Sequence, residues 1–484
     1  MKKSYNNYYK RLQVMSFPKF ADLCTFFKQT CPTILADDPF PNISIDSRSI
    51  QPGTNTLFIA LKGEKADGHE YVSQAADLGA IGAICSKEYA EKTSLDLPKD
   101  FFLIPVENTH DALINLAKWY RTQFTLPVIG VTGSCGKTTV KEMIAQILEG
   151  VGPTLKNKGN FNNEIGLPLT VLNLKPTHQF AVIEMGARHV GDIEVLSSIA
   201  KPTLSVVTLV APAHIEIFKK IDNIAIAKGE IYHGLPKEGF AIVNRDEPYS
   251  DYFIRSCINA KLVTFSLSSG TDYFATDIKL HTTFTEFVLH TPFGKAKIAL
   301  PIPGVHNVSN ALAAASLAGA LGIKLTAIQS GLENFSTITG RMQIKQHEAG
   351  ATIIDDTYNA NPRSLMAAMA VLSNYPGKKY LILGDMGELG EEAPSYHAQM
   401  GLEAKKLGID KLFTVGKLTE HATKAFGEGA VHLASQIAVV ETVQNLIDKN
   451  CTVLVKGSRS AGMEKIVQAL IAKSTEGQAP CLAG

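Results

Sequence analysis

The sequence predicts an α/β protein built from three domains. Its 484 residues are enough for three domains of the usual size, roughly 150 residues each. Short apolar runs that read as buried strands alternate with helix-like segments along most of the chain. The nearly continuous hydrophobicity of these runs is typical of parallel strands that are covered on both faces. We expect boundaries near 105 and 337, giving domains over 1–105, 106–337 and 338–484.

The first domain is expected to be a small α/β module. From about 42 to 105, short apolar runs alternate with turns, and the helix-like AADLGA precedes the strand-like IGAICS. A helix is expected over 110–124, because Leu113, Leu116, Ala117 and Tyr120 fall on one face. This helix leads into the second domain.

The second and third domains are each expected to contain a parallel sheet, because strands alternate with helices in both. The buried strands expected in the second domain are PVIGVT, FAVIEM, LSVVTLV and GFAIVN. Those expected in the third are ATIIDD, KYLILGD, KLFTVG and TVLVKG, each followed by a helix-like segment.

Composition excludes several classes of protein. Hydrophobic residues make up 45% and charged residues 19%, so the chain is not disordered. A net charge of +1 provides no broad basic surface for nucleic acid or an anionic membrane. No apolar run is long enough for a signal peptide or a membrane span. The seven cysteines are odd in number and contain no CxxC pair, which indicates reduced thiols in a cytoplasmic protein.

A glycine-rich loop between a strand and a helix carries the strongest functional signal. The loop TGSCGKTT follows the strand PVIGV and opens a helix with apolar residues at helical spacing. Lys137 can reach the β- and γ-phosphates of a nucleotide, and the Thr138 hydroxyl can ligate Mg²⁺. Val131 stands where a strict GxxxxGK[ST] pattern has glycine, and the alternative is a glycine turn with a chance lysine. We interpret the loop as a site for nucleotide phosphates, formed by Gly133, Ser134, Cys135, Gly136, Lys137, Thr138 and Thr139.

Further polar residues follow the predicted strands. Glu184 ends a buried strand, where a carboxylate is placed to meet the metal of a nucleotide, although a solvated strand-end Glu is the alternative. His214 follows another predicted strand and could ligate a divalent metal, or it could be a surface residue. Lys228 could likewise belong to the site or lie on the surface of a helix. Asn310 could contact a nucleotide or simply belong to a helix start. The sequence NKGN lacks the Asp of a guanine-reading motif, which argues against a GTPase.

A combination of motifs resembles the Mur ligases, which are ATP-dependent, amide-forming enzymes of peptidoglycan precursor synthesis. The resemblance runs from about Ile43 to Leu470. It rests on TGSCGKTT, NKGNFNNEIGLP, IEMGARHVGDI, PAHIE, AKGEIYHGL, GRMQ, IDDTYNANP, LGDMGELG and VKGSRSAGME. The family implies an N-terminal domain that binds UDP, a central P-loop ATPase domain and a C-terminal Rossmann-like domain that closes over the site.

The resemblance also implies roles for individual residues. Lys137 would bind phosphate, while Thr138, Glu184 and His214 would be metal ligands. Lys228 matches a position that is carbamylated in several relatives, where the carbamate bridges a second metal. Contacts to ATP are implied for Asn310, Arg341 and Asp356; contacts on the UDP side for Asp46, Ser47, Arg48, Lys62 and Gly63; and contacts to the incoming dipeptide for Tyr358, Asn359 and Asn361.

The implied reaction uses ATP and two Mg²⁺ ions. It joins the terminal carboxylate of a UDP-N-acetylmuramoyl-tripeptide to D-alanyl-D-alanine through an acyl phosphate, in a cytoplasmic monomer that inserts into no membrane and binds no nucleic acid. Two alternatives stay open on the residues alone: another ligase of the superfamily, such as folylpolyglutamate synthetase, and a non-catalytic ATP-binding regulator. The sequence does not distinguish diaminopimelate from lysine at the third peptide position.

Overall fold

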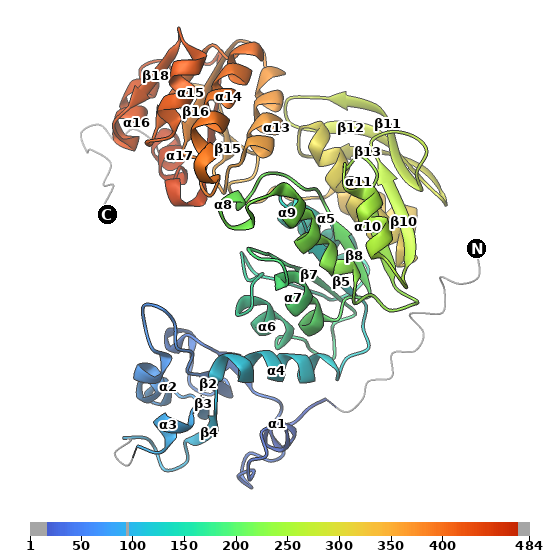
Figure 1. Cartoon of the computed structure of the whole chain (residues 1–484), viewed down its shortest axis with the longest axis vertical. Coiled ribbons are helices and arrows are strands. Elements are labelled where there is room, and N and C mark those ends of the chain that lie inside the picture. The colour runs from blue at the N-terminus through green and yellow to red at the C-terminus, as the bar shows by residue number, and fades with distance from the viewer. Residues whose placement is uncertain (1–16, 93–95, 473–484) are drawn as a thin grey trace.

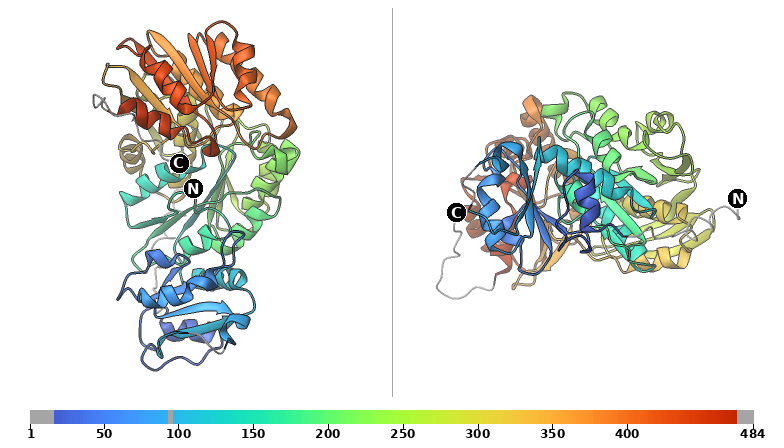
Figure 2. Two further views of the ribbon diagram at one scale, coloured as in Figure 1. Left: turned by 90° about the vertical axis from the view of Figure 1, so that its left-hand side faces the viewer. Right: turned by 90° about the horizontal axis from the view of Figure 1, so that it is seen from below.

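Three α/β domains follow one another along the long axis of the molecule (Figure 1). The computed structural model describes residues 17–92 and 96–472. In the left view of Figure 2, the N-terminal domain lies below the central domain and the C-terminal domain lies above it. The three-domain α/β architecture predicted from the sequence is therefore confirmed.

The N-terminal domain contains a four-stranded parallel sheet in the order β1-β2-β3-β4. Its strands are β1 (Asn42–Ser44), β2 (Thr56–Ile59), β3 (Gly82–Ser86) and β4 (Phe102–Val106). Its helical segments are α1 (Phe20–Phe26), η2 (Ser47–Ser49), η3 (Gly68–Tyr71), α2 (Val72–Asp77) and α3 (Lys87–Ala90). Helix α4 (Thr109–Arg121) follows and is capped by Asn108, whose side chain accepts hydrogen bonds from the backbone amides of His110 and Asp111. Its predicted apolar face is buried and joins this domain to the next.

The central domain contains nine strands in the order β13-β12-β11-β10-β9-β8-β5-β7-β6. The strands are β5 (Val128–Thr132), β6 (Thr154–Lys156), β7 (Phe180–Glu184), β8 (Leu204–Val207), β9 (Phe240–Asn244), β10 (Lys261–Ser266), β11 (Tyr273–Leu280), β12 (Thr285–Thr291) and β13 (Gly294–Leu300). The helical segments are α5 (Lys137–Glu149), α6 (Gly166–Val171), α7 (Asp192–Ala200), α8 (Ile215–Phe218), α9 (Ile221–Gly229), η4 (Glu230–Tyr232), α10 (Ser250–Ser256), α11 (Val305–Ala320) and α12 (Leu325–Glu333).

Strand β5 lies between β7 and β8, so the chain leaves it at a point where the strand order reverses. Ligands of open parallel sheets bind at such points, beyond the carboxyl ends of the strands. The sheet is parallel from β6 to β11, but β11, β12 and β13 pair antiparallel at its edge. The sequence prediction of a parallel sheet did not foresee this antiparallel extension.

The C-terminal domain has six strands in the order β14-β15-β19-β16-β17-β18, with only the edge strand β14 antiparallel. The strands are β14 (Gln343–Gln346), β15 (Thr352–Asp356), β16 (Lys378–Gly384), β17 (Lys411–Val415), β18 (Ala430–Leu433) and β19 (Cys451–Lys456). The helical segments are α13 (Pro362–Ser373), η5 (Gly390–Glu392), α14 (Ala393–Lys406), α15 (Thr419–Phe426), α16 (Gln436–Gln444), η6 (Arg459–Ala461) and α17 (Glu464–Ile471).

One apolar core runs through the central and C-terminal domains. It includes Ile144 of α5, Leu312 of α11, Leu365 of α13 and Leu454 of β19, all fully buried. The two domains therefore pack against each other beside α5, the helix that follows the glycine-rich loop. The boundaries near 105 and 337 stay predictions; β4 ends at Val106 and β14 begins at Gln343.

Two further observations concern the chain as a whole. Among the described residues, no helix combines the length and the apolar character needed to cross a membrane. Six of the seven cysteines lie within the described ranges and have free thiols, and Cys481 lies outside them.

Candidate active site

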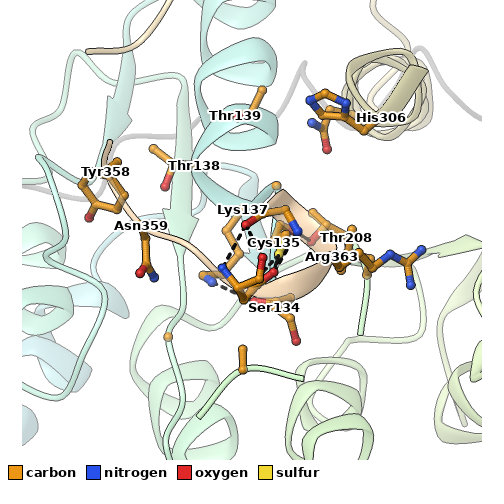
Figure 3. Close-up of a pocket in the computed structure, with 18 of the residues that line it drawn as sticks. Ser134, Cys135, Lys137, Thr138, Thr139, Thr208, His306, Tyr358, Asn359 and Arg363 are labelled. Carbon is orange, nitrogen blue, oxygen red and sulfur yellow. Dashed lines mark hydrogen bonds between the residues drawn. The ribbon is translucent and has the colours of Figure 1, made fainter. Parts of the chain in front are cut away.

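A cavity of about 890 Å³ lies between the central and C-terminal domains, and Figure 3 shows part of its lining. From the central domain it is lined by the glycine-rich loop, the ends of β7 and β8, and the start of α11. From the C-terminal domain it is lined by the segment after β15, the start of α13 and the end of β19. Residues that the sequence places far apart thus line one cavity.

The glycine-rich loop joins buried β5 to α5, as predicted. Gly133 and Gly136 have φ of +145° and +82°, which favour glycine. A Cβ at Gly133 would lie 2.0 Å from the Thr208 hydroxyl oxygen, and one at Gly136 would lie 2.6 Å from Oδ1 of Asn310. The loop is also tied to the segment after β8, because the Ser134 amide donates to the Leu209 carbonyl (2.8 Å).

Lys137 opens α5 and reaches back over this loop. Its amine donates to the Gly133 carbonyl at 2.7 Å, and Figure 3 shows it beside Ser134 and Cys135. Burial lowers the pKa of Lys137, while nearby Glu184 raises it. The loop therefore combines backbone amides, the N-terminus of a helix and a half-buried lysine, the features that bind phosphate groups.

Thr138 lies at the centre of an oxygen-rich cluster. Its hydroxyl donates to Oε2 of Glu184 at 2.9 Å and accepts from Nη2 of Arg341 at 2.9 Å. The other carboxylate oxygen of Glu184 accepts from the side-chain amide of Asn162 at 2.7 Å. Asn157 holds the backbone of Glu184 from both sides, accepting from its amide and donating to its carbonyl. The Glu184 carboxylate is thus buried but oriented by several donors.

His214 and Lys228 line the same cavity. His214 has a left-handed backbone, and its Nδ1 lies 2.5 Å from a carboxylate oxygen of Glu388 in the C-terminal domain. The hydrogen bond from His214 lowers the pKa of Glu388. Lys228 is buried at the end of α9; burial, and then the charge of Lys137, lower its pKa to about 7.

The C-terminal domain contributes a second group of side chains. The Arg341 guanidinium lies over the Tyr358 ring, 4.2 Å from its centre. Asp356 pairs with the buried Lys456 at 2.5 Å and accepts from the Met342 amide at 3.1 Å. The Asp356 carboxylate, which the resemblance implies to contact ATP, is therefore engaged within its own domain in this structure.

Asn359, Asn361 and Asn310 also line the cavity. Asn361 caps α13 by accepting from the Ser364 amide, and it touches the glycine-rich loop through Nδ2, 2.9 Å from the Cys135 sulfur. Asn310 is held by Asn307 at 3.1 Å.

The residues expected on the UDP side lie in the N-terminal domain and do not line this cavity. Asp46 caps η2 and pairs with Arg48 at 2.9 Å, and Ser47 donates to Gln74 at 2.8 Å. The Lys62 carbonyl contacts the His110 ring at 3.1 Å, and Gly63 bonds to Ala66. The structure thus brings the nucleotide and metal candidates together but leaves the UDP candidates in a separate domain.

Sequence reasoning missed several residues that organise the cavity. Asn162 lies in the motif NKGNFNNEIGLP, yet nothing in its spacing indicated that it would orient Glu184. Glu388, in LGDMGELG, contacts His214 only because the domains pack together. Lys456 was visible as a lysine at the end of a buried strand, a signal that the strand-end argument could have used.

The fold and the cavity define a multidomain P-loop protein whose glycine-rich loop faces a cavity that a second domain completes. Residues 39–121 match the catalytic domain of the Mur ligase family, residues 131–318 the Mur ligase middle domain, and residues 340–459 the Mur ligase glutamate ligase domain. The chain therefore belongs to the Mur ligase family, and it is an ATP-dependent ligase.

Individual relatives agree over nearly the whole length. The UDP-N-acetylmuramoyl-tripeptide–D-alanyl-D-alanine ligase of Escherichia coli K12 is 42% identical over 90% of this chain and 94% of its own. That of Bacillus subtilis 168 is 35% identical over 89% of this chain and 93% of its own.

Among solved structures, MurF from Acinetobacter baumannii matches with a TM-score of 0.85 at 35% identity, covering 93% of this chain and 98% of its own. MurF from Thermotoga maritima in complex with ADP matches with a TM-score of 0.77 at 26% identity, covering 89% of this chain and 97% of its own. Mycobacterium tuberculosis folylpolyglutamate synthase, at 16% identity and a TM-score of 0.62 over 77% of this chain and 95% of its own, shares the fold alone.

Proposed function

We propose that this chain joins D-alanyl-D-alanine to UDP-N-acetylmuramoyl-tripeptide with the hydrolysis of ATP, forming the pentapeptide of the peptidoglycan precursor. The observation that carries the proposal is the meeting of Lys137, the Thr138–Glu184 pair and Arg341 in one interdomain cavity. Relatives named for this reaction cover nearly the whole chain, which favours it over folylpolyglutamate synthesis or non-catalytic ATP binding.

A carboxylate is a poor acyl donor, because it is anionic and its leaving group would be oxide. Transfer of the γ-phosphoryl group of ATP to a carboxylate oxygen gives an acyl phosphate and ADP. The neutral amine of D-alanyl-D-alanine then attacks the carbonyl carbon, and phosphate leaves from the tetrahedral intermediate as the amide forms. The amine loses a proton in this step.

The main obstacle is the repulsion between a carboxylate and a triphosphate. We assign Lys137 and Arg341 to offset it, because both cations lie in the cavity beside the glycine-rich loop. Fixed charges that meet the developing negative charge lower the barrier of phosphoryl transfer. The walls that the two domains contribute also limit the access of water to the acyl phosphate, which would otherwise hydrolyse.

The donor set fits Mg²⁺. The Thr138 hydroxyl and the Glu184 carboxylate are hard oxygen ligands 2.9 Å apart. Within residues 17–92 and 96–472 no three His, Cys, Asp or Glu side chains cluster as a metal cage, and Mg²⁺ usually completes its shell with phosphate oxygens and water. The ion would neutralise phosphate charge. We further propose a second ion, held by His214 and a carbamate on Lys228.

The proposed substrate roles follow the division of the molecule. We assign the UDP moiety to the N-terminal domain, at Asp46, Ser47, Arg48, Lys62 and Gly63. We assign the dipeptide to the cavity wall formed by Tyr358, Asn359 and Asn361, and ATP to Asn310, Arg341 and Asp356 beside the loop.

The proposed setting is the cytoplasm, where ATP and UDP-linked substrates occur and where free thiols such as those of this chain persist. We also propose that the chain is active as a monomer, as its resemblance to the family implies.

The test of this function is a mass-spectrometric assay of the intact enzyme with ATP, UDP-N-acetylmuramoyl-tripeptide and D-alanyl-D-alanine. We expect the pentapeptide product only when all three are present. When the tripeptide carboxylate carries ¹⁸O, one labelled oxygen should appear in the released phosphate. Released phosphate without ¹⁸O would contradict an acyl phosphate intermediate. ATP binding without any amide product would favour a non-catalytic ATP-binding regulator.

Asn162 provides a prediction about the metal site. Replacing Asn162 with alanine removes one of the two side-chain donors to the Glu184 carboxylate, so the Mg²⁺ concentration for half-maximal activity should rise about 10-fold. Titration of activity with MgCl₂ measures this shift. Asn173→Ala is the control, because its side chain bonds only to the Leu169 carbonyl on the outside of α6. An unchanged Mg²⁺ requirement in Asn162→Ala would mean that Glu184 does not bind the metal.

A further inference from the structure

An ion pair connects the C-terminal domain with the central domain beside the cavity. Arg363 is the second residue of α13, and Glu247 follows β9. Nη2 of Arg363 donates to Oε1 of Glu247 at 3.0 Å, and Nη1 lies 3.3 Å from the Val210 carbonyl oxygen. The other oxygen of Glu247 accepts from the Val210 amide at 2.9 Å. Arg363 thus contacts two separate segments of the central domain, and we call this group the Arg363–Glu247 bridge.

The two partners differ in their surroundings. The Glu247 side chain is only 1% exposed, whereas that of Arg363 is 48% exposed. Burial raises the pKa of Glu247, while the Val210 amide and Arg363 lower it. A buried carboxylate without a counter-charge is costly, and here the counter-charge comes from another domain. Moving the C-terminal domain away would leave Glu247 with the Val210 amide as its remaining donor.

The bridge lies next to the phosphate loop. Ala211, which follows Val210, exchanges hydrogen bonds of 3.0 Å with the Ser134 hydroxyl of the glycine-rich loop. Asn361, two residues before Arg363, touches Cys135 of the same loop. The segment from Val210 also leads to His214. A displacement of α13 would therefore change contacts on both sides of the loop that holds Lys137.

We propose that Arg363 and Glu247 are a positioning pair that holds the C-terminal domain against the glycine-rich loop in the arrangement competent for phosphoryl transfer. The pair acts through this arrangement and through the loop. This proposal depends on the proposed function only because turnover is one of the measurements that test it. The free energy of the ion pair is available only when the two domains are together, so it favours the closed arrangement.

The test compares Arg363→Met, Glu247→Gln and the double variant. Arg363→Met leaves a buried carboxylate unpaired, so we expect kcat/KM for ATP to fall about 10-fold or more. Glu247→Gln removes that uncompensated charge, so the double variant should be less impaired than Arg363→Met alone. Arg363→Lys keeps the charge and should recover most of the activity. Arg245→Met is the matched control; it breaks an exposed pair with Asp251 inside the central domain and should change kcat/KM less than twofold.

Small-angle scattering of the full chain with ATP provides a readout that does not depend on turnover. The wild type should contract, and Arg363→Met should keep a larger radius of gyration at the same ATP concentration. Independent, additive losses in the double variant would overturn the proposal. So would an unchanged kcat/KM with only a lower unfolding temperature, since that is the behaviour of a packing contact. A wild type that makes no pentapeptide would refute the proposed function, while the scattering comparison would still decide the role of the bridge.

Discussion

Replacement of Lys137 by alanine is expected to remove nearly all turnover while the chain stays folded. The amine lies over the glycine-rich loop, 2.7 Å from the Gly133 carbonyl, and supplies a half-buried positive charge where the phosphates are proposed to bind. Loss of such a preorganised charge typically costs several kcal/mol of transition-state stabilisation, a rate decrease on the order of 10³-fold. Phosphate release in the complete reaction measures the effect.

The loop should survive this substitution, because other groups determine its shape. Gly133 and Gly136 permit its backbone conformation, and hydrogen bonds from Ser134 and Thr208 hold it against the neighbouring segment. The unfolding temperature of Lys137→Ala should therefore stay close to that of the wild type. Lys175→Ala, at an exposed position, is the control for removal of a lysine charge. Near-normal phosphate release by Lys137→Ala would remove the loop from the mechanism.

Lys228→Ala is expected to be inactive and to recover partly when short-chain carboxylates are added. The side chain is buried in the cavity, so an added carboxylate could occupy the space of the proposed carbamate. Activity with and without acetate or propionate measures the rescue. Lys220→Ala, an exposed lysine just before α9, should keep full activity with or without carboxylate. A fully active Lys228→Ala would mean that this lysine has no role in the reaction.

The pKa of Lys228 also predicts a pH dependence. Burial lowers that pKa to about 7, so the neutral amine predominates above pH 7 and the ammonium form below it. Carbamylation needs the neutral amine, which forms an N–C bond with CO₂ and releases a proton. Enzyme depleted of CO₂ should therefore regain activity with bicarbonate faster at pH 8 than at pH 6. Equal recovery at both values would argue against a carbamate on this amine.

The sequence was most informative where the signal is local. The strand before the glycine-rich loop and the helix after it were predicted from a continuous apolar run and from helical spacing, and both are present as β5 and α5. The remaining predicted strands of the central and C-terminal sheets are also present. Strand β12 was missed because its residues alternate between buried and partly exposed, and β13 because most of its residues are exposed, unlike the continuous buried runs of the parallel strands.

By itself, the sequence determined the fold class, the phosphate loop and the residue types at the strand ends, because periodicity and short motifs act over a few neighbouring residues. Only the tertiary structure decided which of them meet. Arg341 contacts Thr138 across 203 residues, Asn361 contacts Cys135 across 226, and Arg363 pairs with Glu247 across 116. Spacing along a chain carries no information about how two domains pack or where side chains point across the interface. The direction of each side chain is fixed only when the apolar core shared by the two domains has formed.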